Sequence, residues 1–207
     1  MRGRIRKTVV VAGVALLLLA PQIAPAAPAD DEVKETSFRL TDGSRVLRHE
    51  AIVAAPREQV FAAFTTSEGL RSFAAPVVAI DLRIGGDWEA TYDPHRKLGA
   101  PGNIHNEVLA FLPPEMLTIR VREAPPRFPH PEIVRQVWTV IQLEDAGNGR
   151  TRVVISMLPY RDGADWDVVY ELFRRGNAIV MRHLQDRFAT GKPVDWTAAE
   201  REARPGG

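Results

Sequence analysis

Cysteine is absent from all 207 residues of the chain. Without thiols there is no disulfide framework, no cysteine nucleophile and no acylated lipoprotein anchor. Stability must therefore come from a packed apolar core, and the chain is long enough to bury a substantial one.

Long hydrophobic runs are also missing. The uncharged segment Thr8–Ala20 is shorter than the roughly 20 residues that a membrane-spanning helix needs, and Pro21 follows it. Four basic residues precede this segment, and small-x-small sites end at Ala26 and Ala29. This order is typical of a secretory signal peptide. We expect residues 1–29 to be a leader that is removed near Ala26 or Ala29, and the protein to be periplasmic or secreted. An uncut leader that tethers the chain weakly is the alternative.

The chain has no large excess of charge of one sign, with 27 basic and 26 acidic residues. The first 29 residues contain four of the basic residues and none of the acidic ones, so the remainder has 23 basic and 26 acidic residues, a net charge of about −3. Such a balance leaves no basic excess to attract nucleic acid or anionic lipid. We expect no nucleic-acid partner, and no stable membrane anchor once the leader is cut.

The common catalytic and cofactor motifs are absent as well. The sequence has no nucleophile elbow, no Walker-type loop and no dinucleotide fingerprint, and its five histidines are scattered singly. Metal ligation needs histidine, aspartate or glutamate at converging positions. We therefore expect neither a metal nor a cofactor, and interpret Gly85-Gly86 as a hairpin turn.

Short strand-like and helix-like patterns do fill the chain. The segment Val46–Ala55 is β-prone and ends at Pro56, after which apolar residues recur at helical spacing in 57–64 and 66–73. A small hairpin is expected around Asp42-Gly43. The later segments that read as strands, by alternation or β-prone composition, are 77–84, 88–92, 103–112, 117–121, 133–143 and 151–158.

The clearest helical pattern comes last. Apolar residues recur every three or four positions from Trp166 to Phe188, before Gly191 and Pro193. A long helix with one apolar stripe must bury it against a large partner, and the sheet is the only one available. The sequence therefore predicts an α+β fold. Its curved antiparallel sheet of six to seven strands wraps around the long C-terminal helix, and two short helices follow the first strand. Asp162 and Asp165 near the start of this helix are explained by helix capping, or less simply by a carboxylate pair at a cavity mouth.

In this order of elements the chain resembles the START-like (SRPBCC) superfamily, and within it the bacterial branch similar to the activator of the heat-shock ATPase. The match covers about Val46 to Gly191, and Phe73 stands where the family usually has tryptophan. The resemblance implies a helix-grip fold around an apolar, ligand-sized cavity, more than it implies catalysis. The motifs that carry it are Ala54–Phe61, Thr65–Leu70, Gly85–Trp88, Glu107–Leu117, Gly149–Val153 and Gly163–Trp166.

These observations divide the chain into four parts. They are a signal peptide at 1–29, an N-terminal extension at 30–45, the START-like domain at 46–191 and a C-terminal tail at 192–207.

The candidate site residues fall into two groups. Aromatic side chains are expected to form the wall of an apolar pocket, although packing in the core explains each of them singly. His105 and Glu107 lie two apart on one predicted strand, so they share a face. If that face is inward they form a candidate acid and base; if outward, an ordinary polar surface. The aromatic candidates are Trp88, Tyr92, Phe111, Trp138, Trp166, Tyr170 and Phe173.

Two functions compete on this basis. The first is an exported binding protein for a small hydrophobic molecule such as a lipid, an isoprenoid or an aromatic compound. The alternative is a cyclase, dehydratase or hydrolase that acts on an aromatic or polyketide-like substrate in the same cavity. Two ionisable groups that point into the cavity would favour the enzyme, whereas an apolar cavity lining would favour the binding protein. No heat-shock ATPase partner is expected, because an exported protein would not meet one.

Overall fold

The computed structural model describes residues 32–198. The predicted signal peptide at 1–29 and the last nine residues of the predicted tail lie outside the described residues. Within the described part, none of the helices combines the length and the hydrophobicity that crossing a bilayer requires.

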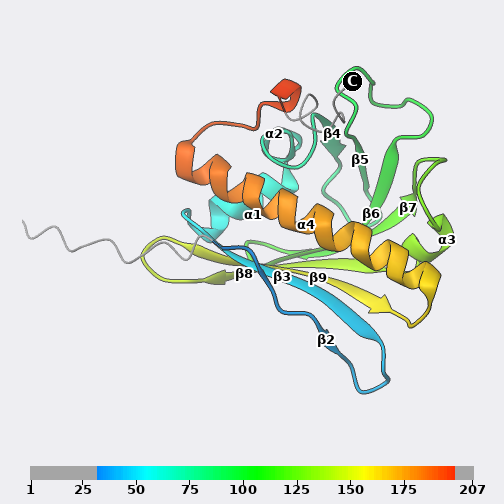
Figure 1. Ribbon diagram of the computed structural model, residues 1–207. Helices are drawn as coiled ribbons and strands as arrows, with labels where there is room; N and C mark the ends of the chain where they lie inside the picture. Colours follow the sequence, from blue (N-terminus) through cyan, green and yellow to red (C-terminus); the bar gives the residue numbers. More distant parts are fainter. Residues whose placement is uncertain (1–31, 199–207) are drawn as a thin grey trace, which may run out of the picture.

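The described strands form one antiparallel sheet, shown in Figure 1. Its order is β1-β3-β9-β8-β7-β6-β5-β4, and β2 also pairs with β3. The sheet has nine strands rather than six to seven, because the N-terminal extension contributes the two-residue strands β1 and β2 along β3. The strands are β1 Lys34–Glu35, β2 Phe38–Arg39, β3 Arg45–Val53, β4 Val77–Ile80, β5 Asp87–Thr91, β6 Ile104–Leu112, β7 Met116–Glu123, β8 Trp138–Asp145 and β9 Thr151–Tyr160.

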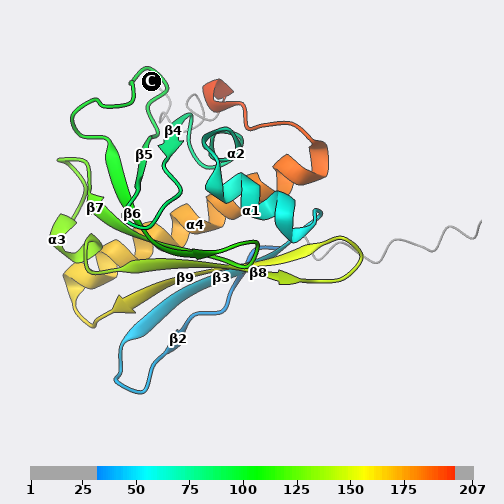
Figure 2. The same cartoon turned by 180° about the vertical axis from the view of Figure 1, so that it is seen from behind.

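Four helices that lie wholly within the described residues accompany the sheet. They are α1 Arg57–Thr65, α2 Ser67–Arg71, α3 Pro131–Val134 and α4 Ala164–Thr190. The long helix α4 runs across one face of the curved sheet, with α1 and α2 beside its C-terminal half (Figures 1 and 2). The predicted α+β helix-grip architecture is confirmed.

The position of α4 follows from its sequence. Val169, Met181 and Leu184 lie on its inner face and are almost completely buried. The helix ends at Gly191, whose φ of 72° is in the left-handed region that favours glycine. Beyond it, the indole nitrogen of Trp196 donates a hydrogen bond to the Arg71 carbonyl at 2.8 Å, so the described part of the tail returns to α2.

Two predicted strands differ from the structure by more than two residues at one end. The alternating pattern through Ile84 predicted a longer strand, but β4 ends at Ile80 and Ile84 is 73% exposed. The residues after Ile80 form a turn in which Gly86 approaches the Asp81 carbonyl so closely that a Cβ would lie 2.0 Å from its oxygen. Only glycine allows this approach, so a tight turn replaces the end of the strand.

The predicted strand at 133–143 begins five residues later than expected. Its first residues form α3, in which Pro131 occupies the start of the helix, where a missing N–H costs nothing. Ile133 and Val134 are buried there, with Val137 just after the helix. Their apolar character therefore reflects a buried helical turn, which a short apolar run cannot distinguish from a strand.

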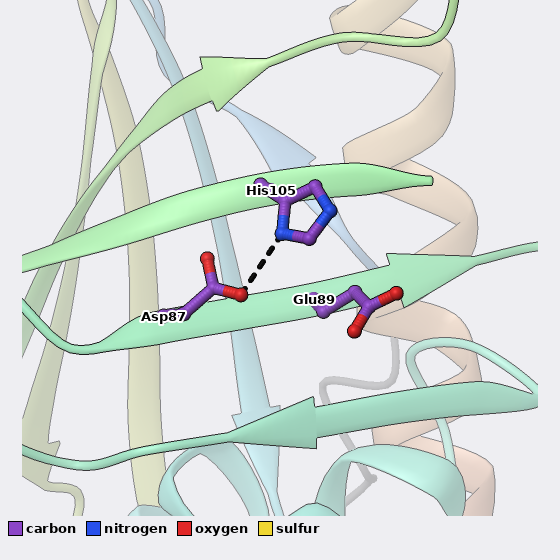
Figure 3. A group of neighbouring side chains, drawn as sticks. All are labelled: Asp87, Glu89 and His105. Carbon is purple, nitrogen blue, oxygen red and sulfur yellow. Dashed lines mark hydrogen bonds and ion pairs between the residues drawn. The ribbon is translucent and has the colours of Figure 1, made fainter. Parts of the chain in front are cut away.

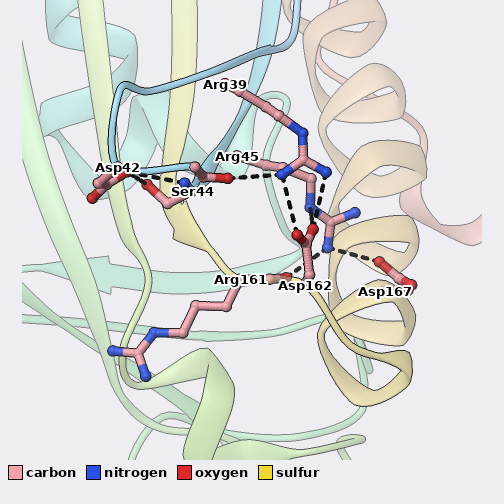
Figure 4. A network of polar contacts seen from close by, with 8 residues as sticks. Arg39, Asp42, Ser44, Arg45, Arg161, Asp162 and Asp167 are labelled. Carbon is pink, nitrogen blue, oxygen red and sulfur yellow. Dashed lines mark hydrogen bonds and ion pairs between the residues drawn. The ribbon is translucent and has the colours of Figure 1, made fainter.

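A charged network joins the N-terminal hairpin to the start of α4 (Figure 4). Asp162 accepts a hydrogen bond from Arg39 at 2.9 Å, and Arg45 contacts Asp167 at 2.7 Å. The hydrogen bond and the charge of Arg39 lower the pKa of the Asp162 carboxyl. The N-cap position itself is Gly163 and has no side-chain cap, so the capping explanation for Asp162 is wrong and ion pairing replaces it.

One of the buried polar residues is a histidine, His49. His49 faces inward from β3, is 2% exposed, and its Nδ1 has no hydrogen-bond partner. Burial lowers the pKa of this imidazole below its ordinary 6.5, because the charged ring loses hydration. Burial therefore favours the neutral form of the ring in the native state.

We predict that stability is full above pH 6.5 and falls as the pH drops below it, because the unfolded chain binds a proton that the native state resists. The slope contributed by this group is at most about 1.4 kcal/mol per pH unit. Denaturant unfolding between pH 5 and 8 would measure it. His49→Gln is expected to flatten the profile. Equal slopes in the parent protein and in His49→Gln would contradict the assignment.

Candidate ligand-binding site

The sheet and α4 enclose a cavity whose floor is built by strand alternation. Each of five neighbouring strands contributes two residues, spaced two apart, so the floor repeats the period of two that the sequence shows. The floor residues are Trp88 and Ala90 of β5, Ile104 and Asn106 of β6, Ile119 and Val121 of β7, Thr139 and Ile141 of β8, and Ile155 and Met157 of β9.

The roof and the walls come from helices and loops. Phe173, Asn177 and Val180 of α4 lie at four- and three-residue spacing and cover the floor. Phe64 and Phe73 close the end near α1 and α2, where their rings meet edge to face at 5.1 Å. At the opposite end the boundary is formed by the loop after β7 and by α3.

The cavity has a volume of about 180 Å³. An apolar cavity of about 150 Å³ is enough to hold benzene, whereas pockets for drug-sized ligands measure about 300–1,000 Å³. The space therefore fits a single ring or a short branched chain.

Within the described part of the chain, the lining carries no carboxylate, imidazole, ammonium or guanidinium group. Apart from Tyr92, the indole of Trp88 and the thioether of Met157, its polar side chains are Asn106, Thr139 and Asn177. The Asn106 amide donates to the Trp88 carbonyl at 3.3 Å, and the Asn177 amide donates to the Met157 sulfur at 3.3 Å. An ionised group enclosed here would lose hydration without gaining a counter-charge, so the lining suits an uncharged molecule or the uncharged part of one.

The predicted aromatic wall is only partly found in the cavity. Trp88, Tyr92 and Phe173 line it. Trp138 is 49% exposed on β8, whose Thr139 and Ile141 face inward.

The other three aromatic candidates pack elsewhere. Phe111 is partly buried and packs against the hydrophobic core. Trp166 and Tyr170 pack around buried Tyr160, with ring centroids 6.3 Å and 5.1 Å from it, in a second apolar cluster near α3.

Asn106, Thr139 and Asn177 were not among the predicted site residues. Two of them carried a signal in the sequence. Asn177 interrupts the apolar stripe of the long helix four residues after Phe173, and Asn106 separates His105 from Glu107 and so occupies the opposite face of the strand. Thr139 carried no such signal, because threonine is common in strands.

His105 and Glu107 share a face as predicted, but it is the face of β6 opposite to the cavity lining. His105 Nδ1 lies 2.9 Å from Asp87, and Glu107 accepts a hydrogen bond from Arg120 at 3.0 Å. Neither residue is among those that line the cavity. In this structure they belong to the polar outer surface of the sheet.

Asp87, Glu89 and His105 form a cluster on that outer face (Figure 3). One ligand atom from each lies within 4.8 Å of the others, a spacing that a metal ion could draw together. Each residue also has a protein partner. Asp87 accepts from Arg122 at 3.0 Å and faces His105, and Glu89 accepts from the Gly99 amide at 2.6 Å and the Asn103 side chain at 2.5 Å. The bonds of Glu89 hold the loop between β5 and β6.

That loop forms one rim of the cavity mouth. It meets the proline-rich loop after β7 at Gly102, which has a φ of 81° and where a Cβ would lie 3.1 Å from the Pro126 ring. A larger residue would be strained and would push the two rims apart. Glu89 does not line the cavity, but its hydrogen bonds to the loop position one rim of the cavity mouth.

We predict that Glu89→Ala loosens this rim. Losing two hydrogen bonds to a carboxylate should accelerate exchange of the Gly99 amide hydrogen by about tenfold or more, since such bonds are stronger than neutral ones. Site-resolved hydrogen exchange would measure the rate. Glu58→Ala, at an exposed position of α1, serves as the control. An unchanged Gly99 rate in Glu89→Ala would show that the loop is held by other contacts.

The sheet, the long helix and the cavity between them define a helix-grip domain of the START-like class. The chain belongs to the family of activator of Hsp90 ATPase homolog 1-like proteins, which matches residues 54–193, more than half of its length. Domains of this family are typically ligand-binding. A comparison with curated proteins found no match.

Several solved structures share the fold. The Aha1 dimer from Colwellia psychrerythraea has a TM-score of 0.56 at 18% identity, over 71% of this chain and 98% of that one. A conserved protein of unknown function from Enterococcus faecalis has a TM-score of 0.55 at 16% identity, over 82% of this chain and 87% of that one. CalU16 from Micromonospora echinospora has a TM-score of 0.55 at 18% identity, over 82% of this chain and 92% of that one. At these identities the likeness shows the fold alone.

Proposed function

We propose that the protein binds a small hydrophobic molecule in the cavity between α4 and the sheet. The observation that supports this most strongly is the lining, which is apolar except for a few neutral polar groups. Burying an apolar ring there gains about 25 cal/mol for each Å² of apolar surface removed from water. A binding protein needs nothing further from the site.

The enclosed part of the ligand is uncharged and about the size of one ring. The volume sets the size, and the absence of a counter-charge among the lining residues sets the charge. Asn106, Thr139 and Asn177 provide neutral groups for a hydroxyl or carbonyl. An aromatic or alicyclic compound fits this description, whereas a long-chain lipid requires the cavity to widen.

The enzymatic alternative has less support from the site. It depended on an acid and a base that both point inward, and His105 and Glu107 are both engaged on the outer face of the sheet. CalU16 and the other solved relatives share only the fold, so they add no argument for turnover.

We predict that filling the cavity removes binding. Ala90 is 7% exposed and lies on the floor, so Ala90→Phe would place a ring in the space that the ligand occupies. Titration with 4-butylbenzyl alcohol, followed by the fluorescence of Trp88 and the other tryptophans, should show at least a tenfold loss of affinity, a loss of about 1.4 kcal/mol or more.

The matched control is Val168→Phe, which adds the same ring at a position of α4 that is 48% exposed. It should bind like the parent protein, and thermal unfolding should show that both variants fold. Undiminished binding by a folded Ala90→Phe protein would place the ligand elsewhere.

We also propose that the protein acts outside the cytoplasm, in the periplasm or secreted. The basic residues, the short apolar segment and the small-x-small sites of residues 1–29 support this. Expression in the native host followed by fractionation and intact-mass measurement should find a chain that begins near residue 27 or 30 outside the cytoplasm. A full-length chain in the cytosol would refute export and would leave open an encounter with a heat-shock ATPase.

A further inference from the structure

A second hollow continues outward from the cavity mouth. This groove, of about 580 Å³, shares Ala90, Tyr92, Ile104 and Pro125 with the cavity. Tyr92 is 63% exposed where the two meet. A molecule that leaves the cavity at this end therefore enters the groove directly.

The groove differs from the cavity in its charge. Arg96 comes from the loop between β5 and β6, and Arg127 from the loop after β7, so the two rims each contribute one guanidinium. Among residues 32–198, Asp93 is the only acidic residue that lines the groove, and its carboxylate accepts a hydrogen bond from the His95 amide at 2.9 Å. The lining is thus positive overall.

Neither arginine is neutralised by a protein carboxylate within residues 32–198. Arg96 donates to the Pro101 carbonyl at 3.2 Å and the Asn103 side-chain oxygen at 3.4 Å, and these acceptors are uncharged. Arg127 is exposed and takes part in none of the hydrogen bonds or ion pairs of this part of the chain. Its five N–H donors are available for an anion.

We propose that this groove, called here the mouth groove, binds an anionic group, most suitably a carboxylate, on the same ligand whose apolar part fills the cavity. The inference rests on the proposed function and narrows it to amphiphilic organic acids of one-ring size. Arg127 is the main recognition residue, because a guanidinium forms paired hydrogen bonds with a carboxylate. Arg96, held by its loop, adds positive charge from the other rim.

The arrangement separates the two requirements of such a ligand. The enclosed cavity accepts the ring and excludes charge, whereas the mouth groove is open to water, so a carboxylate there keeps part of its hydration. Because the contact is partly exposed, its contribution should be modest and sensitive to salt.

The test compares 4-butylbenzoate with 4-butylbenzyl alcohol, which differ mainly in the charge of the polar end, by calorimetric titration of the full chain at pH 7. At low salt the acid should bind about fivefold more tightly than the alcohol, and the difference should shrink as salt is raised. Arg127→Gln should abolish the preference and leave alcohol binding unchanged. Asp93→Asn should strengthen it, because the amide keeps the acceptor for His95 and removes the negative charge.

Arg182→Gln is the matched control, since this exposed arginine of α4 lines neither hollow. Equal affinities for the acid and the alcohol would contradict the proposal that the mouth groove binds an anion, and so would a preference for the acid that persists in Arg127→Gln. The cavity proposal would stand in both cases. If neither compound binds, both proposals fail. Loss of alcohol binding in Arg127→Gln would also count against the assignment, because it would show that Arg127 supports the cavity itself.

Discussion

The apolar stripe of α4 has to be buried against the concave face of the sheet. Most other features of the structure depend on where these two surfaces are in contact and where they separate. The helix packs mainly against β3, near the edge of the sheet where the N-terminal strands are added. Over β5 to β8 the sheet curves away from it. Phe173, Asn177 and Val180 then face the floor across a gap, and that gap is the cavity.

This geometry also explains why the site is apolar inside and charged at its edge. The floor residues belong to the inner face of the sheet, whose other members pack as core. The alternation that builds the sheet therefore selects uncharged and mostly apolar floor residues. The loops at the open end have no such constraint, and they carry Arg96 and Arg127. The difference in chemistry between cavity and mouth groove is thus a result of topology.

The sequence was sufficient to predict the fold, because alternation and helical spacing are strong over most of the domain. It failed where one residue overrides a pattern. Gly86 ends β4 through a close backbone approach, and Pro131 starts a helix inside an apolar run. Three of the seven aromatic candidates line the cavity and four do not. Burial alone does not determine whether a ring faces the cavity or another part of the molecule.

The polar partners were the least predictable part of the site. Whether His105 faces inward depends on the register of β6, because a shift of one residue exchanges the two faces of a strand. The sequence permitted either orientation, and pairing with β5 settles it by setting His105 opposite Glu89 and next to Asp87. The mouth groove joins two loops separated by a whole hairpin, a contact that no local pattern encodes.

The central claim is that the gap between α4 and the sheet holds the ligand. The most direct test is methyl NMR of the protein with 4-butylbenzyl alcohol, observing contacts between ligand protons and isoleucine methyl groups. We predict intermolecular contacts with Ile119, Ile141 and Ile155, which line the cavity, and none with exposed Ile84 or Ile179. Contacts confined to the exposed methyl groups, or no contacts at saturating ligand, would contradict the account.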